Sequence, residues 1–207
     1  MKEPFQGSFW GDLTIDPLAR KQRTRRLLAA CIAAAATVVA GALLIQGAAS
    51  TVRSASESAC AALRPDPLTA TLRALVPDFD LPDLTGKKVS LRSLLGRPVL
   101  VSFFATWCPP CVEESSSLEE LARRLGNKAT VAIVSVDEDL DALKKYFAKG
   151  SQATVVRDES RKVPASFGTS KFPESFLLDS AGKVRYAFIN KRDWSVSEAV
   201  ACVEGLK

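Results

Sequence analysis

Residues 98–114 read PVLVSFFATWCPPCVEE, and this stretch decides the fold. Its first part, Val99 to Ala105, is an apolar run with β-branched and aromatic residues, which predicts a buried strand. The run stops at Thr106, and a CxxC motif from Cys108 to Cys111 follows. The sequence therefore predicts two cysteines at the start of a helix that comes directly after a buried strand.

The start of a helix changes the chemistry of a cysteine. Backbone N–H groups without intrahelical partners and the positive end of the helix dipole favour a thiolate over a thiol. We therefore predict Cys108 as the nucleophile of disulfide exchange and Cys111 as the resolving thiol, the two forming a redox-active disulfide. Pro109 and Pro110 suit the first helical turn and stiffen the loop, and Trp107 shields one side of the sulfur.

A zinc site is the alternative reading of a CxxC motif, but it needs further ligands. The chain has no histidine, and Cys31, Cys60 and Cys202 each stand alone in the sequence. The lack of histidine also excludes Ser-His-Asp and Cys-His nucleophiles. We expect no metal and no cofactor beyond the cysteine pair.

The net charge of +5 and the pI near 9.0 come largely from one local cluster. The rest of the chain is close to neutral, so the charge gives no argument for a nucleic-acid surface. The cluster comprises Arg20, Lys21, Arg23, Arg25 and Arg26.

An uncharged segment follows this basic cluster, from Leu27 to Val52. It is longer than the roughly 20 residues that cross a bilayer as a helix. We predict a transmembrane anchor at residues 27–49 and a cytoplasmic tail at residues 1–26, because basic residues favour the cytoplasmic side. The remainder would then lie in the periplasm, tethered to a bacterial inner membrane by a single span.

Three alternatives compete for this segment. Gly47 to Ser50 offers small residues for a signal peptidase, and Thr24 to Leu28 partly resembles a twin-arginine signal. A buried helix of a soluble protein is the third alternative. Leu28 to Cys31 looks like a lipoprotein box, but no hydrophobic region precedes it, so we reject that reading.

Beyond the anchor, residues 50–70 are rich in Ser, Ala and Pro, and we predict that they form a tether with a short helix. We predict an α/β domain over residues 71–207. A turn signal at Thr85 to Lys88 predicts a β-hairpin before the core. The pattern after the CxxC motif alternates between strands and helices. We predict helices over Glu113–Leu125, Asp137–Ala148, Arg161–Phe167 and Ser195–Leu206, strands over Thr130–Val136, Ala153–Val156, Phe172–Asp179 and Val184–Ile189, and Ser195 or Ser197 as the last N-cap.

Three stretches together resemble a known family. They are the leader Phe79 to Leu91, which is of the AhpC/TSA-Redoxin type, the core Pro98 to Cys111, and the late run Phe172 to Asp179. The sequence resembles the TlpA/ResA-like thiol–disulfide oxidoreductases of the thioredoxin superfamily, which include the cytochrome c maturation thioredoxins. The resemblance implies a thioredoxin-like fold, with a central mixed sheet flanked by helices and an N-terminal hairpin extension.

The resemblance also implies roles for residues outside the CxxC motif. Pro173 would follow a cis peptide bond and face the active-site disulfide, where Phe172 offers its backbone to a substrate strand. We expect Trp107, Pro109 and Pro110 to complete this substrate-binding surface, although a turn or edge-strand role is the alternative for Pro173.

The same comparison implies a proton acceptor on the helix. Thioredoxin keeps a buried Asp six residues before its first active-site Cys, and Ser102 stands there in this chain. The TlpA-like group carries instead a Glu three residues after the second Cys, which is Glu114. Residues i and i+3 share a helix face, so Glu114 could take the proton of Cys111. The alternative is an acidic residue favoured by the helix dipole, as Glu113 would be.

Cys60 and Cys202 would both lie on the exported side, where thiols tend to be oxidised in pairs. A structural disulfide between them would tie the tether to the last helix. Unpaired small core residues are the alternative, because sequence cannot supply the required Cα separation.

These observations predict a membrane-anchored periplasmic thiol–disulfide oxidoreductase that reduces disulfides in specific clients. The resemblance implies clients such as apocytochrome c or a copper-site assembly protein, and a membrane electron donor of the DsbD type. The alternatives are a disulfide oxidase, a thioredoxin-fold peroxidase and a metal chaperone that does no catalysis. A peroxidase would need a Thr where Ala105 stands, and a chaperone would need a His.

Overall fold

The computed structural model describes residues 35, 37–39, 41–43, 51, 54–74 and 77–206. The chain divides into two units, residues 1–49 and 50–207, and the second contains the α/β domain. The predicted tail lies outside the described residues, and so does most of the predicted anchor. Within the residues that are described, no helix has both the length and the apolar character needed to cross a membrane.

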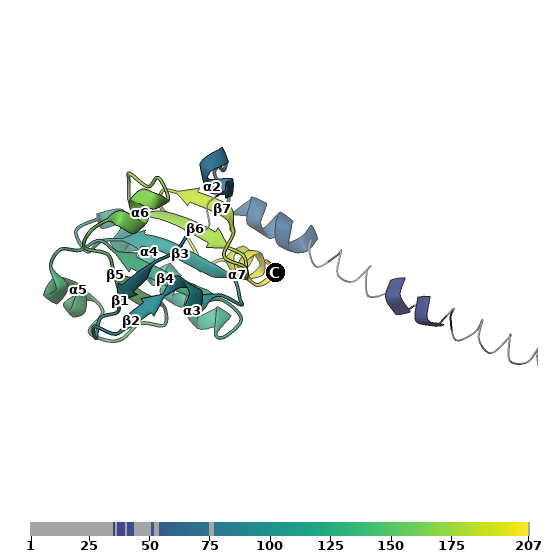
Figure 1. The fold of residues 1–207 in the computed structure, drawn as a ribbon, viewed down its shortest axis with the longest axis horizontal. Coiled ribbons are helices and arrows are strands. Elements are labelled where there is room, and N and C mark those ends of the chain that lie inside the picture. Colours follow the sequence, from purple (N-terminus) through teal and green to yellow (C-terminus); the bar gives the residue numbers. More distant parts are fainter. Residues whose placement is uncertain are drawn as a thin grey trace, which may run out of the picture. The chain divides into compact units, whose positions relative to one another are not determined.

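A five-stranded mixed sheet forms the centre of the second unit, in the order β5-β4-β3-β6-β7. β3 pairs in parallel with β4, and β4 in parallel with β5, whereas β6 runs antiparallel to both β3 and β7. This is the mixed sheet that the sequence predicts (Figure 1). The strands are β3 (Val99–Phe104), β4 (Thr130–Ser135), β5 (Thr154–Arg157), β6 (Glu174–Leu178) and β7 (Val184–Ile189).

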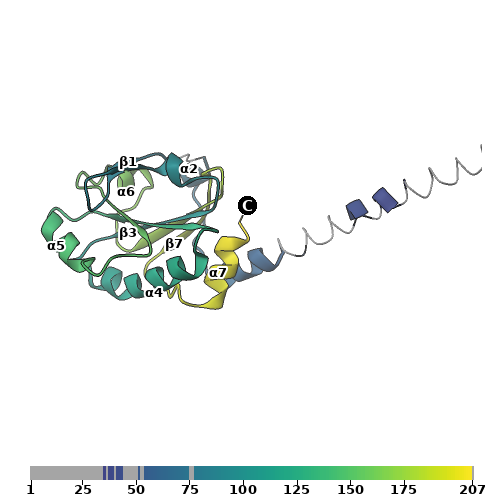
Figure 2. The ribbon, with the colours of Figure 1, turned by 90° about the horizontal axis from the view of Figure 1, so that it is seen from below.

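Helices cover both faces of the sheet, as Figure 2 shows: α4 and α7 lie on one face, and α2 and α6 lie on the other. The predicted hairpin also forms, with β1 (Asp80–Pro82) antiparallel to β2 (Lys88–Ser90). The helices are α2 (Ala70–Ala74), α3 (Leu91–Leu94), α4 (Pro109–Leu125), α5 (Leu140–Tyr146), α6 (Lys162–Ser166) and α7 (Ser197–Glu204).

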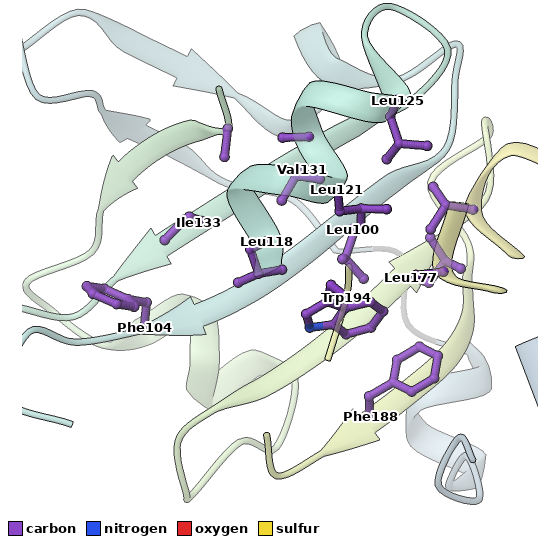
Figure 3. Close-up of a cluster of buried hydrophobic side chains, with 14 of the residues drawn as sticks. Leu100, Phe104, Leu118, Leu121, Leu125, Val131, Ile133, Leu177, Phe188 and Trp194 are labelled. Atoms are coloured by element: carbon purple, nitrogen blue, oxygen red, sulfur yellow. The ribbon is translucent and has the colours of Figure 1, made fainter. Parts of the chain in front are cut away.

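Two apolar clusters fill the space between the sheet and its helices. Because every side chain of β3 is buried, this strand contributes to both clusters, as the continuous apolar run predicts. On the α4 face, Leu118 and Leu121 pack against Leu100 beside Trp194 and Phe188 (Figure 3). The centroids of the Phe188 and Trp194 rings lie 5.1 Å apart, edge to face. The redox motif is therefore attached to the most buried strand of the sheet.

The helix boundaries differ from the prediction in physically simple ways. α4 begins at Pro109, which confirms the predicted helix start at the CxxC motif and lies before the range predicted from Glu113, because both prolines occupy first-turn positions that need no N–H donor. α5 begins at Leu140, where the Asp139 carboxylate caps the backbone. α6 keeps Pro164 in its first turn for the same reason as α4.

The predicted N-cap of the last helix is wrong. Val196 occupies that position and provides no side-chain cap. The two predicted hydroxyls bond elsewhere: Ser195 Oγ donates to Asp193 Oδ1 at 2.6 Å, and Ser197 Oγ donates to Glu198 at 3.0 Å. A serine near a helix start therefore fails as a cap when a neighbouring carboxylate takes its hydroxyl.

Part of the predicted tether packs against the domain. Residues 54–62 are helical, and a disulfide joins Cys60 to Cys202 of α7. Asp66 forms an isolated bridge with Ala187 of β7. The Arg192 guanidinium donates to the carbonyl of Leu63 at 3.2 Å and to the Asp66 carboxylate at 3.2 Å. These contacts fix residues 60–66 to the same side of the domain as the last strand and helix.

Candidate functional site

The two cysteines lie where β3 ends and α4 begins. Cys108 is the N-cap of α4, and its Sγ accepts a hydrogen bond from the Cys111 N–H at 3.3 Å. Cys108 and Cys111 form a disulfide, so the structure describes the oxidised state. Pro109 and Pro110 occupy the first positions of the helix and are exposed. The Cys108 sulfur therefore sits among backbone donors at a helix N-terminus, which stabilises a thiolate once the pair is reduced.

The surroundings of the disulfide make the two sulfurs unequal. Cys108 is 6% exposed and Cys111 is 1% exposed. Trp107, immediately before the motif, is 55% exposed and so presents a large apolar surface next to Cys108. An incoming group would therefore meet Cys108 first.

The Trp107 ring contacts two side chains that come from other segments of the chain, Phe172 and Arg161. Its ring meets Phe172 edge to face at 6.1 Å between centroids, and the Arg161 guanidinium carbon lies 5.7 Å from its ring centroid. Arg161 in turn pairs with Glu138 at 3.2 Å. The indole is therefore oriented by contacts although most of it faces solvent.

The peptide bond between Phe172 and Pro173 is cis. Pro173 directly precedes β6, whose first residue Glu174 pairs with Phe103 near the end of β3. This register brings Pro173 to the edge where β3 leads into the CxxC motif. The structure thus gathers Trp107, Phe172 and Pro173 around the cysteines.

Asp137 anchors the loop before the motif, and sequence reasoning missed it. Its buried carboxylate accepts the Thr106 N–H at 3.1 Å and the Thr106 hydroxyl at 2.6 Å. The Ser135 hydroxyl donates to it at 2.6 Å. The available signal was an aspartate directly after a buried strand, which the sequence instead suggested as the start of α5. Asp137 positions the loop and does not touch the sulfurs through any hydrogen bond described.

Glu114 is buried on α4, 2% exposed, one turn after Cys111. One carboxylate oxygen, Oε1, accepts the Arg192 backbone N–H at 2.9 Å and the Trp194 indole N–H at 2.8 Å. The other oxygen, Oε2, is buried and has no hydrogen-bond partner in the part of the chain that is described. A carboxylate with a free oxygen at this depth can accept a proton.

Burial raises the pKa of Glu114 above its ordinary value of 4.5. The two donated hydrogen bonds and the positive charges of Arg192 and Lys191 act in the opposite direction, and burial prevails. The Arg192 and Trp194 contacts span about 80 positions of sequence, so local pattern could not have predicted them.

Ser102, which stands at the position of the thioredoxin aspartate, is buried on β3. Its register partner on β6 is Ser175, which is also buried. Neither hydroxyl has a hydrogen-bond partner among the residues described. Ser102 offers no carboxylate, whereas α4 carries the buried carboxylate of Glu114 one turn after Cys111.

Cys60 and Cys202 form a second disulfide, and each of them is 0% exposed. Their disulfide joins the helical residues 54–62 to α7. Because both sulfurs are inaccessible, this pair fits a structural role.

The geometry defines a class of protein: a thioredoxin-like domain with a cysteine pair at the start of its first core helix and a cis-proline beside it. A family model described as Redoxin matches residues 73–203. The chain belongs to the redoxin family.

Relatives and solved structures agree with this assignment. The chain is 37% identical over 111 residues to the thiol-disulfide oxidoreductase ResA of Bacillus anthracis, covering 52% of this chain and 64% of that protein. The chain thus spans less than two thirds of the length of such curated relatives. A candidate thiol:disulfide interchange protein DsbE from Chlorobium tepidum matches with a TM-score of 0.53 and 30% identity, over 56% of this chain and 84% of its own.

A third comparison concerns the domain alone. The thioredoxin domain of a thiol-disulfide oxidoreductase from Bacteroides vulgatus matches with a TM-score of 0.55 and 26% identity, over 62% of this chain and 94% of its own. Together these similarities confirm the resemblance to the TlpA/ResA-like group and the thioredoxin-like fold.

Proposed function

We propose that this protein is a thiol–disulfide oxidoreductase that exchanges disulfides with protein clients through Cys108 and Cys111. The observation that carries the proposal is the position of the pair: Cys108 caps α4, and its sulfur accepts the Cys111 N–H. The family relation to ResA-like thiol-disulfide oxidoreductases supports the same activity.

In the reducing direction, the reaction has two exchange steps. The Cys108 thiolate attacks one sulfur of a client disulfide, forming a mixed disulfide and releasing the other client sulfur as a thiolate. Cys111 then loses its proton and attacks Cys108, which breaks the mixed disulfide. The client leaves as a dithiol, and the protein is left with the Cys108–Cys111 disulfide that the structure contains.

Glu114 would take the proton of Cys111 in the second step. It lies three residues after Cys111, on the same helix face, and is buried with it. Its raised pKa brings the carboxylate closer to the range of a thiol, which favours proton transfer.

Clients would dock against the surface formed by Trp107, Phe172 and Pro173. The exposed indole gives apolar contact area, and the backbone of Phe172, in the bend before β6, would offer its polar groups to a client strand. Pro109 and Pro110 follow Cys108 directly, are exposed and would complete the surface.

We further propose that the domain works in the periplasm, attached to the bacterial inner membrane through residues 27–49. The basic cluster followed by an uncharged run supports this location, and so does the buried Cys60–Cys202 disulfide, because structural disulfides are typical of oxidising compartments. Apocytochrome c or a copper-site assembly protein would be the client, and a membrane protein of the DsbD type would return electrons.

A trapping experiment tests the activity. Cys111→Ser leaves Cys108 able to attack but removes the resolving thiol, so covalent mixed disulfides with clients should accumulate in cells. Cys108→Ser serves as the matched control and should trap none. If Cys111→Ser reacts normally with a small thiol reagent yet captures no protein, the proposed client exchange is wrong.

The direction of exchange needs a separate measurement. We expect the full chain, equilibrated against glutathione, to have a reducing potential close to that of thioredoxin. A strongly oxidising potential would instead assign the oxidase role.

A further inference from the structure

A second site lies on the face of the sheet opposite α4. A cavity of about 430 Å³ opens between α2, the segment after α6, β6 and β7. Its walls include Leu72, Phe167, Phe176 and Ile189, which are apolar. This size and lining are typical of small-ligand pockets, which combine apolar walls with a few polar groups.

Glu174 is the acidic group that lines this cavity. The residue is 7% exposed, and its carboxylate makes no ion pair and no hydrogen bond of normal geometry with any residue described. Burial raises the pKa of Glu174, and the nearby Thr169 hydroxyl lowers it by less. The Thr169 hydroxyl oxygen has no hydrogen-bond partner of normal geometry within the described residues. Because the Glu174 carboxylate lines the open cavity, a donor that enters the cavity can bind it directly.

The charges around Glu174 indicate the sign of that ligand. Asp66 faces it from the segment before α2 and raises its pKa, and Lys171 from the segment before β6 lowers it. The Asp66 carboxylate accepts hydrogen bonds from the Ile189 N–H at 2.7 Å and from the Arg192 guanidinium at 3.2 Å. The residues that line the cavity include Glu174 and not Asp66, so a cation that enters it would meet the Glu174 carboxylate.

We propose that this cavity binds an alkylammonium group, with the apolar chain against Phe167, Phe176 and Leu72 and the ammonium on the Glu174 carboxylate. Both a free amine and the lysine side chain of a peptide carry this chemistry. A charge-assisted hydrogen bond would give the Glu174 carboxylate a positively charged partner. The site uses neither cysteine, so the proposal does not depend on the redox activity.

The test is a titration of the full, oxidised chain with n-butylammonium, followed by NMR shifts of the residues around Glu174. We expect saturable binding, whereas n-butanol, which has the same chain without the charge, should bind at least about tenfold more weakly. N-acetyl-lysine methylamide distinguishes the two sources: binding as tight as that of n-butylammonium assigns a peptidyl lysine, and weaker binding assigns a free amine.

Two variants and one control complete the test. Glu174→Gln keeps the shape and removes the charge, so it should weaken n-butylammonium binding at least about tenfold. Ala187→Leu narrows the cavity while keeping the carboxylate and should weaken both probes. Glu198→Gln removes an exposed charge on α7 and should change neither. The proposal is overturned if n-butylammonium does not saturate, if n-butanol binds equally well, or if Glu174→Gln binds as the wild type does.

Discussion

Two buried glutamates lie on opposite faces of one sheet, and their surroundings differ. Glu114, on the α4 face, receives two N–H donors on one oxygen from the segment before α7. Glu174, on the α2 and α6 face, lines a cavity and makes no ion pair with any residue described. Burial raises the pKa of both.

The difference separates two uses of a buried carboxylate. The donors to Glu114 fix its orientation and leave one oxygen free next to the cysteine helix, which suits a group that must receive a proton repeatedly. Glu174 has no such fixed donors, which suits a group whose partner arrives from outside.

The largest effect should follow from removing the Glu114 carboxylate. Glu114→Gln keeps the shape but cannot accept the Cys111 proton, so resolution of a mixed disulfide at Cys108 should slow by about 10²-fold. The measurement is a single-turnover assay with a preformed mixed disulfide at Cys108. Glu113→Gln, which changes the exposed neighbour on the same helix, is the matched control and should resolve at the wild-type rate. Equal rates in both variants would contradict the role of Glu114.

Removing the indole donor should have the next largest effect. Trp194→Phe removes the hydrogen bond to Glu114 and leaves a smaller ring in a fully buried position, so the free energy of unfolding should fall by about 1–3 kcal/mol. Because a donor to the charged form is lost, the pKa of Glu114 should rise further, and the pH midpoint of the resolution step should move upward.

A purely structural role for Trp194 would lower stability and leave that midpoint in place. The pH profile of resolution and chemical denaturation of the same variant separate the two readings. An unchanged midpoint together with lower stability would mean that the indole packs against Glu114 without tuning it.

The sequence predicted the redox helix that carries Glu114 better than it predicted the contacts of the two buried glutamates. The apolar run before the CxxC motif and the first-turn prolines follow local rules, which is why β3 and the start of the redox helix could be predicted. The partners of Glu114 could not, because Trp194 reaches it only after the chain has crossed the sheet and returned. Asp137 was missed for a related reason: its partner Thr106 lies on the neighbouring strand's loop, 31 positions away.

Glu174 was predicted only as part of a strand. In the sequence it lies between a proline and a serine in an otherwise apolar run, and no sequence pattern indicates that its side chain lines a cavity. The cavity depends on how α2, α6 and β7 pack together, which is a property of the tertiary structure. The buried hydroxyls of Ser102 and Ser175 were equally beyond reach, because their pairing follows from strand register.

Removing the charge of Glu174 should have a moderate effect on the free energy of unfolding. Its pKa is raised in the folded state, so the folded protein binds the proton more tightly than the unfolded chain does. The stabilisation from this group is fully present below the ordinary value of 4.5 and is lost as the pH rises through the raised pKa.

Glu174→Gln cannot ionise, so the variant does not lose this stabilisation as the pH rises. We expect the variant to be more stable than the wild type near neutral pH by about 0.5–1 kcal/mol, a modest gain because solvent in the open cavity screens the charge. Chemical denaturation of both proteins at pH 4 and pH 7 measures it, and the gap between them should shrink at the lower pH. A variant that is less stable at pH 7 would show that the carboxylate already has a partner in the folded protein.

The smallest change in stability should come from two buried hydroxyl groups, one with a hydrogen-bond partner and one without. Ser175 Oγ is buried without a hydrogen-bond partner among the described residues, whereas Ser135 Oγ donates to Asp137 at 2.6 Å. Ser175→Ala should therefore change the free energy of unfolding by less than about 0.5 kcal/mol, or raise it slightly, because no hydrogen bond is lost. Ser135→Ala leaves a buried carboxylate short of one donor and should be the more destabilising of the two. Ser175→Ala could instead lower the free energy of unfolding as much as Ser135→Ala does. That result would mean that the hydroxyl of Ser175 makes a hydrogen bond that stabilises the fold, so that Glu114 would not be the only hydrogen-bonded polar side chain among these buried groups on the α4 face.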